Sequence, residues 1–222
     1  MQEIKTITLN NQLYTYTITY KNIKNCYLKV EQGQIKISCS RLFDINKIEQ
    51  LIINNQDKII KQLNEYQPKY LYQDKGYVDI FNKRYQIVLK DLQIKKCVIH
   101  DDKIYVYDKH LQQCIEQYLK QILYNYLETK IQEYLKTSFQ LVFPKIEIKK
   151  LKRRWGACFY QKNKLSFNLA LVHLDYQLID YVIIHELCHF IEANHSKAFY
   201  LEIEKRLPDY KERERKLKEV SL

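Results

Sequence analysis

The feature that most constrains this chain is an apolar helical segment that leads into two histidines four residues apart. Residues 178–184 are almost entirely apolar, His185 and Glu186 follow directly, and His189 comes one helical turn later. Side chains four residues apart lie on one face of an α-helix, so both imidazoles can reach a single metal ion. Because the preceding turns are apolar on most sides, the segment predicts a buried helix with a metal-binding face at its end.

Glu186 has the place of a general base in this pattern, because it follows the first histidine and can reach a metal-bound water without being a ligand. Zinc lowers the pKa of such a water towards 7, and a neighbouring carboxylate then takes its proton as the water attacks a carbonyl. The pattern therefore favours zinc-dependent hydrolysis with His185 and His189 as ligands. The alternative is a structural His/Glu pair on a buried helix.

Catalytic zinc typically has three protein ligands and one open position, so a third ligand is needed. We expect it to be His195, because Asn194 would end a helix over residues 176–193 and Ser196 would cap the next helix. Some zinc peptidases take a glutamate from the following helix instead. Three glutamates remain as alternative ligands: Glu192, Glu202 and Glu204.

The periodicity of the rest of the chain predicts an α+β protein. Apolar residues at helical spacing predict four helices, over residues 44–66, 110–137, 176–193 and 196–207, and a charged helix closes the chain. Alternation predicts strands in the first 40 residues and at 77–81, 85–89, 97–100, 104–107, 145–151 and 164–168. We expect a strand-rich N-terminal region over residues 1–109, containing the helix at 44–66, and a helix-rich domain over residues 110–222.

The net charge of +11 is concentrated in two segments. Residues 144–164 carry eight Lys or Arg against one Glu, a net charge of +7, and residues 205–219 carry seven against four, a net charge of +3. A basic segment such as 145–164 can attract a nucleic acid or a nucleotide. Charge alone favours the alternative of a solvated strand and a salt-bridged terminal helix.

Hydropathy and cysteine usage indicate in which cellular compartment the protein is located. No run approaches the roughly 20 apolar residues of a membrane span, and the first residues lack the basic-then-apolar layout of a signal peptide. We therefore expect a cytoplasmic protein with no membrane partner. The six cysteines contain no CxxC pair, so we expect free thiols and no disulfide partner.

Several further segments resemble the YgjP-like zinc metallopeptidases, relatives of the SprT and WLM zincins. The resemblance covers most of the chain, and the segments that carry it are Arg154-Trp155-Gly156-Ala157-Cys158, Asn168, Ile179-Asp180-Tyr181-Val182, the HExxH helix, Asn194-His195-Ser196 with Phe199, and Pro208-Asp209-Tyr210-Lys211-Glu212-Arg213. It implies a compact zincin-like catalytic domain behind a strand-rich N-terminal half, with His185, His189 and His195 as zinc ligands and Glu186 as the catalytic base.

Two departures from the family pattern lie near this motif. The family usually has Ser-Cys-Ser after Trp-Gly, whereas this chain has Ala157-Cys158-Phe159, which removes two hydroxyls. The aromatic residue after Phe199 is usually Trp, and here it is Tyr200. Neither change touches an expected ligand, so only a role of those hydroxyls in substrate contact is in question.

Three residues are candidates for contacting the substrate or stabilising the transition state: Arg154, Tyr210 and His173. Arg154 has the charge to pair with a substrate carboxylate, or with Asp180 or Glu192 of the chain itself. Trp155 and Gly156 have two interpretations, a core anchor with close backbone approach or the rim of a cleft, and the first is favoured.

These observations favour a zinc-dependent peptidase that acts on peptide or protein substrates. The basic segment motivates an alternative, a hydrolase of nucleoside triphosphates on the same metal, although phosphoryl transfer more often uses Mg²⁺ held by carboxylates. A third hypothesis, by analogy with the SprT and WLM relatives, is a nucleic-acid-associated protease. Three glycines exclude a Walker loop or a Gly-rich dinucleotide turn.

Overall fold

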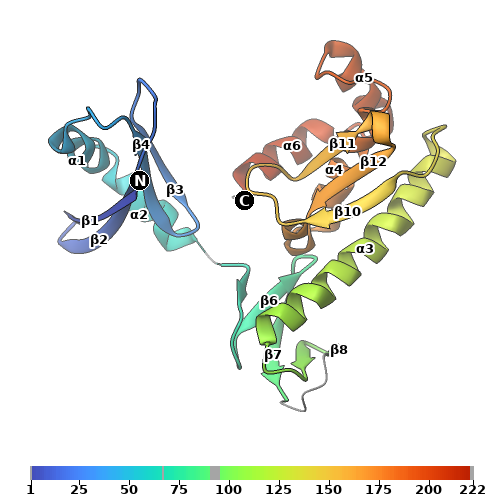
Figure 1. The fold of residues 1–222 in the computed structure, drawn as a ribbon, viewed down its shortest axis with the longest axis horizontal. Helices are drawn as coiled ribbons and strands as arrows, with labels where there is room; N and C mark the ends of the chain where they lie inside the picture. The colour runs from blue at the N-terminus through green and yellow to red at the C-terminus, as the bar shows by residue number, and fades with distance from the viewer. Residues whose placement is uncertain (1, 67, 91–95, 221–222) are drawn as a thin grey trace. The chain divides into compact units, whose positions relative to one another are not determined.

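The computed structural model describes residues 2–66, 68–90 and 96–220 and divides the chain into two compact units. The first unit ends at Pro68, and the second runs from Lys69 to Val220 (Figure 1). Strands dominate the N-terminal half and helices the C-terminal half, which confirms the predicted α+β fold class. Residues 221–222, the end of the expected second domain, lie outside the described residues.

The first unit is a four-stranded sheet packed against two helices. Its elements are β1 (Gln2–Leu9), β2 (Gln12–Tyr20), β3 (Tyr27–Glu31), β4 (Gln34–Cys39), α1 (Ile45–Ile53) and α2 (Gln56–Glu65). The strand order is β1-β2-β4-β3, with β2 and β4 parallel and the outer pairs antiparallel. Alternate strand residues such as Ile35 and Ile37 are buried in one core with Ile48 and Ile52 of α1.

The helix expected over residues 44–66 is two helices, because the chain breaks at Asn54 and Asn55. Asp44 caps α1 as predicted, its side chain accepting a hydrogen bond from the Asn46 backbone N–H at 2.9 Å. The Asn55 side chain donates to the Leu51 carbonyl at 2.8 Å, in competition with the helical pattern. Asparagine side chains that bond to nearby backbone favour helix ends over helix interiors.

The second unit contains two sheets joined by a long helix. The five-stranded sheet has the order β5-β6-β7-β9-β8, formed by β5 (Tyr70–Leu71), β6 (Tyr77–Ile80), β7 (Lys83–Leu89), β8 (Cys97–His100) and β9 (Lys103–Val106). Helix α3 (Leu111–Thr137) extends from this sheet to the three-stranded sheet (Figure 1). That sheet has the order β10-β12-β11, formed by β10 (Lys145–Lys149), β11 (Gly156–Phe159) and β12 (Lys164–Asn168).

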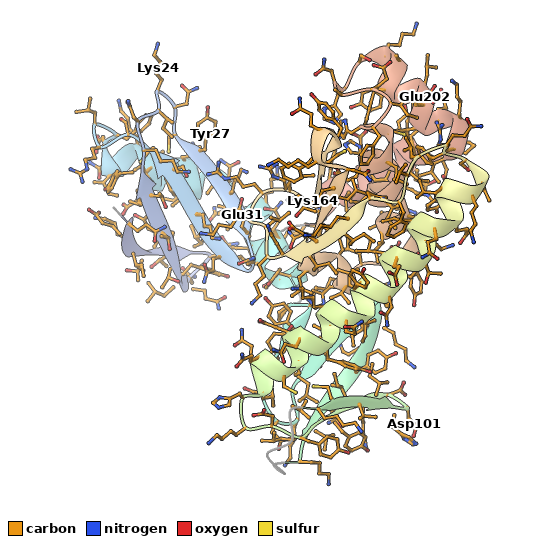
Figure 2. All side chains as sticks on the ribbon, turned by 45° about the vertical axis from the view of Figure 1, so that its right-hand side comes forward. Lys24, Tyr27, Glu31, Asp101, Lys164 and Glu202 are labelled. Atoms are coloured by element: carbon orange, nitrogen blue, oxygen red, sulfur yellow. The ribbon has the colours of Figure 1, made fainter. Side chains whose placement is uncertain are left out.

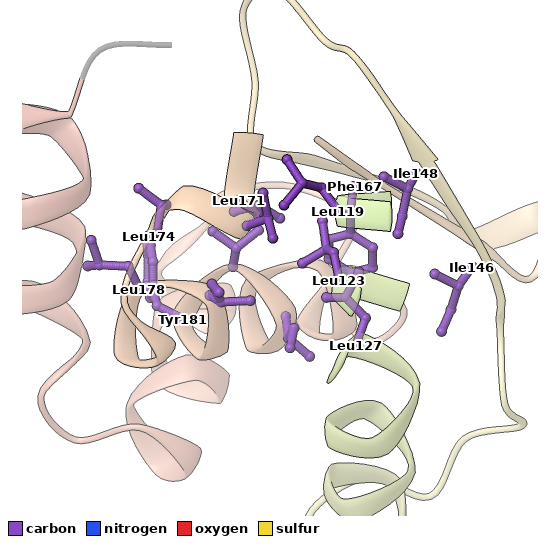
Figure 3. Close-up of a cluster of buried hydrophobic side chains, with 14 of the residues drawn as sticks. Leu119, Leu123, Leu127, Ile146, Ile148, Phe167, Leu171, Leu174, Leu178 and Tyr181 are labelled. Atoms are coloured by element: carbon purple, nitrogen blue, oxygen red, sulfur yellow. The ribbon is translucent and has the colours of Figure 1, made fainter. Parts of the chain in front are cut away.

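The remaining elements are η1 (Tyr160–Lys162), η2 (Leu169–His173), α4 (Tyr176–Cys188), α5 (Lys197–Arg206) and α6 (Tyr210–Glu219). Helix α4 packs on β11 and on α3, η2 packs on α3, and α5 and α6 pack on α4. Figure 3 shows the core between them, in which Leu123 of α3, Phe167 of β12 and Leu178 of α4 lie in one apolar cluster. Helix α4 is thereby held on a rigid support, with Asp175 capping its start by accepting from the Leu178 N–H at 2.9 Å.

The division between the units differs from the expected boundary between residues 109 and 110. It falls after Pro68, because the five-stranded sheet shares its core with the later helices. Val78 and Ile104 of that sheet are buried in the same cluster as Leu119 of α3 and Ile183 of α4. Secondary-structure content changes near residue 110, but the hydrophobic core continues across that point.

Helix α4 also ends earlier than expected. It stops at Cys188, with His189 as its C-cap in the αR conformation, instead of continuing to residue 193. The next N–H groups bond three residues back, Phe190 to Leu187 at 3.1 Å and Ile191 to Cys188 at 2.9 Å, so the last turn is tightened. Strand β11 was not predicted from the sequence; its four residues pair only with β12 and form a sheet edge within the described residues.

Candidate active site

Three histidines converge at the C-terminal end of α4. One ring nitrogen from each of His185, His189 and His195 lies within 4.8 Å of the other two. The Nε2 atoms of His185 and His195 are 3.1 Å apart. Two nitrogens on a tetrahedral zinc with bonds of about 2.05 Å would be roughly 3.3 Å apart, so the spacing fits a shared ion.

The local fold accounts for this convergence. His185 and His189 lie one turn apart on α4, and the αR conformation of His189 keeps the helical spacing at the helix end. The tight turn after α4 then returns the chain to His195. Ser196 caps α5 by accepting from the Phe199 N–H at 3.3 Å, as predicted from the sequence, and this places His195 just ahead of α5.

Phe199 forms an apolar floor under the three imidazoles. Its ring centroid lies 5.0, 4.5 and 4.8 Å from those of His185, His189 and His195, and its side chain is fully buried. An aromatic ring at this position restricts the rotamers of all three histidines and excludes water from one side of the site. This role of Phe199 was not predicted from the sequence, since a buried aromatic residue on a helix usually belongs to the hydrophobic core.

Burial favours the neutral form of His185 and His189, which is the form that binds metal. Burial, and secondarily His189 and His195, lower the pKa of His185 to about 3. Burial also lowers the pKa of His189. The Nδ1 atom of His185 is a buried polar atom without a hydrogen-bond partner, which is rare away from functional sites. Three imidazoles are a donor set that suits zinc, so these residues fit the metal expected from the sequence.

The alternative glutamate ligands lie outside this cluster. Glu202 forms ion pairs with Lys205 and, at 2.7 Å, with Arg206. Among the described residues, the group of candidate ligand atoms around His185 contains histidines alone, without Glu192, Glu202 or Glu204. The backbone carbonyl of Glu192 nevertheless accepts from His189 Nδ1 at 3.2 Å, which leaves Nε2 of that ring for a metal.

Glu186 is buried beside the histidines, with 6 % of its surface exposed. Burial raises the pKa of Glu186 to about 8, while the charge of Arg154 and a hydrogen bond from the Cys158 backbone act in the opposite direction. A cation held by the histidines would lower this pKa further, because it stabilises the carboxylate. Glu186 is therefore placed to exchange a proton near neutral pH.

An open cavity of about 820 Å³ leads to these residues. His185, Glu186 and His189 lie on one side of it, Trp155 and strand β11 on another, and Glu214 and Lys218 of α6 line it as well. Trp155 also packs on the hydrophobic core, so both interpretations of this residue apply. A cavity of this volume accommodates a small peptide segment or a ligand of similar size.

The three residues expected to contact substrate have different positions. Arg154 lines the cavity. Tyr210 is buried, stacks on Tyr200 with ring centroids 6.0 Å apart and is not among the lining residues. His173 is buried in another part of the unit, where its Nδ1 lies 2.6 Å from the Asp79 carbonyl oxygen. The structure therefore brings only Arg154 to the site, since helix packing places Tyr210 and His173 in the core.

A histidine triad beside a buried glutamate, in an open cavity of an α+β fold, is the arrangement of a metal-dependent hydrolase of the metallopeptidase class. A family model described as YgjP-like, metallopeptidase domain, matches residues 24–220. The chain therefore belongs to the YgjP-like metallopeptidase family, as the resemblance in the sequence indicated.

Comparison with solved structures found the crystal structure of the metallopeptidase zymogen of Pyrococcus abyssi abylysin. It has 24% sequence identity and a TM-score of 0.39, over 41% of this chain and 90% of that chain. A comparison with curated proteins gave no match. Among residues 2–66, 68–90 and 96–220, no helix combines the length and apolar character that a membrane span requires.

Proposed function

We propose that this metallopeptidase is zinc-dependent, with His185, His189 and His195 as ligands and Glu186 as the general base. The observation that carries the proposal is the convergence of three imidazoles on one point next to a buried carboxylate. Three histidine ligands leave a fourth coordination position open, which a catalytic site needs and a structural site does not.

In this proposal, several residues of the chain have separate roles in peptide hydrolysis. Bound zinc supplies Lewis acidity, which polarises the scissile carbonyl and lowers the pKa of water. The carboxylate of Glu186 takes the proton from the attacking water and delivers it to the leaving amine. Arg154 and the Cys158 N–H favour the ionised carboxylate before the reaction. Phe199 and the buried end of α4 restrict the rotamers of the imidazoles and exclude water from one side of them.

Metal removal and reconstitution test the proposal. The protein is stripped with a chelator, divided, and reloaded with zinc or with magnesium, and each sample is incubated with an unbiased peptide mixture read by mass spectrometry. We expect cleavage only after zinc loading. Cleavage by the stripped sample, or by the magnesium sample alone, would contradict the assignment.

The nucleotide alternative is tested with the same samples. Hydrolysis of nucleoside triphosphates by the zinc-loaded or magnesium-supplemented protein, without peptide cleavage, would favour a phosphoanhydride hydrolase. Nucleic-acid association predicts a salt-dependent affinity for DNA or RNA, which a filter-binding titration measures. The cytoplasmic location proposed from the sequence is tested by cell fractionation.

A further inference from the structure

The positive charge of the basic segment 144–164 is neutralised at some residues and left free at others. Lys149 and Lys164 both pair with Glu147, at 2.9 and 3.2 Å, and Lys150 pairs with Glu116 at 2.6 Å. Lys164 is labelled on β12 in Figure 2. Glu147 thus neutralises charge on β10 and β12, and the pair of Lys150 with Glu116 links this segment to α3.

The next three basic residues differ from these lysines. Within the part of the chain that the structure describes, Lys152, Arg153 and Arg154 are exposed and form no ion pair. Arg153 and Arg154 line the cavity that contains Glu186, whereas Lys152 does not. The unpaired charge thus reaches the active site at two residues that are consecutive in the sequence, Arg153 and Arg154.

The backbone that carries these arginines is fixed. Asn168, 2 % exposed, donates from Nδ2 to the carbonyls of Leu151 and Arg154, at 2.7 and 3.0 Å. Its Oδ1 accepts from the Leu151 N–H at 3.3 Å, and its own backbone N–H donates to the Trp155 carbonyl at 2.8 Å. Because the loop is hydrogen-bonded at both ends, the two arginine side chains extend from a fixed backbone position. A fixed position favours specific recognition of a ligand over non-specific electrostatic attraction.

Within the described residues, the acidic residues that line the cavity, Glu186 and Glu214, form no ion pair with Arg153 or Arg154, although the charge of Arg154 acts on Glu186. Glu214 is paired with Lys218 at 2.9 Å, and Glu186 is the proposed base. Guanidinium groups bind carboxylates with paired, charge-assisted hydrogen bonds, more specifically than ammonium groups do. A carboxylate on the substrate is the group that complements this wall of the cavity.

We propose that Arg153 and Arg154 form a subsite for an acidic side chain of the peptide substrate, close to the scissile bond. The inference rests on the proposed function, because it assigns a substrate class to that same site. It predicts that peptides with Asp or Glu near the cleaved bond bind more tightly than their neutral counterparts. It also gives a function to the basic segment that does not require nucleic acid.

Binding and cleavage are measured on the full-length, zinc-loaded protein with matched peptides. Each set carries Glu, Gln or Lys at one position near a mapped cleavage site or, if none is found, at one position of a fixed peptide. Fluorescence anisotropy with the Glu186→Gln protein measures affinity without turnover, and the unsubstituted protein gives kcat and KM. We expect about tenfold tighter binding of the Glu peptide than of the Gln peptide, reduced by salt.

The variants are chosen so that charge and position are separated. The double variant Arg153→Gln, Arg154→Gln is expected to bind Glu and Gln peptides equally, with a raised KM for the Glu peptide. Lys152→Gln is the matched control, since it removes one charge from the same loop outside the cavity, and it is expected to keep the preference. Thermal melting of each variant checks that the fold is intact.

Each outcome decides the proposal. If the protein with Arg153 and Arg154 in place binds Glu and Gln peptides with equal affinity, the subsite is overturned. A preference for the Glu peptide that persists in the double variant would also overturn it. A nucleoside triphosphate that binds through these arginines while no peptide binds would also overturn it. Zinc-dependent cleavage without acidic preference would leave the proposed function standing. Arginine-dependent acidic preference in binding, without cleavage of any peptide, would support the subsite and count against the proposed function.

Discussion

Gly156 of β11 lies directly against the carboxylate of Glu186. A Cβ atom at Gly156 would be 2.6 Å from Glu186 Oε1 and 2.8 Å from its Cγ, closer than real Cβ atoms come. A side chain at this position would therefore force Glu186 to move. The glycine lets strand β11 approach α4 until the Cys158 backbone can hydrogen-bond to the carboxylate.

The substitution Gly156→Ala is expected to displace Glu186 while leaving the three histidines in place. Displacing a catalytic group by about 1 Å costs on the order of 100-fold in rate, so kcat should fall by about that factor. Zinc affinity should stay within about twofold, because no ligand moves. Kinetics and zinc content are measured on the same preparation. Unchanged kcat in the alanine variant would show that the contact does not position Glu186.

His195 is expected to be the third ligand, although it lies outside the helix that carries the other two. His195→Ala should weaken zinc binding by at least about 100-fold, measured by competition with a chromophoric chelator. The matched control is Glu202→Gln on α5, whose ion pairs with Lys205 and Arg206 keep it away from the metal. Loss of zinc in the Glu202 variant with retention in the His195 variant would reverse the assignment.

His173 is expected to make stability depend on pH. Burial lowers its pKa below the ordinary value of 6.5, so the unfolded chain binds the proton more readily than the folded chain does. The stabilisation is present above about pH 6.5 and is lost as pH falls below it towards the folded-state pKa. Urea unfolding of chelator-treated samples measures this effect. The unfolding free energy should fall more between pH 7.5 and pH 5.5 in the unsubstituted protein than in His173→Asn.

Both proteins keep the other histidines, so the difference between the two pH dependences isolates His173. An equal loss of unfolding free energy in the variant would show that the imidazole titrates normally.

Asn168 is expected to stabilise the loop that carries Arg153 and Arg154. Asn168→Ala removes four side-chain hydrogen bonds in a buried position, three with Leu151 and Arg154 and one from the Ala170 N–H, and should lower the unfolding free energy by about 2–4 kcal/mol. The control is Asn125→Ala on the exposed face of α3, expected to change stability by less than about 0.5 kcal/mol. Chemical denaturation measures both, and similar losses would rule out a special role for the buried amide.

Helix α4 and the spacing of its two histidines could be predicted from sequence because their signals are local. The four-residue spacing of His185 and His189, the apolar turns before them and the Ser196 cap each depend on neighbouring residues only. The α+β content follows from periodicity for the same reason. Strand β11 was missed because four residues around Gly156 carry too little alternation to distinguish a strand from a turn.

Other features depend on contacts between distant residues, which a single sequence does not display. The boundary after Pro68 reflects a core shared by Val78 and Leu119, and the place of His173 reflects its hydrogen bond to Asp79. The approach of Gly156 to Glu186 spans thirty positions of the chain. Tyr210 carried a plausible chemical group, but packing on Tyr200 placed it in the core.

We propose that His185, His189 and His195 hold the metal while Glu186 performs proton transfer. Zinc content and peptide cleavage, measured on the same preparations of the unsubstituted protein and Glu186→Gln, test this division of roles. We expect equal zinc content and a loss of cleavage of at least about 1,000-fold in the variant. Cleavage retained by zinc-loaded Glu186→Gln would contradict it.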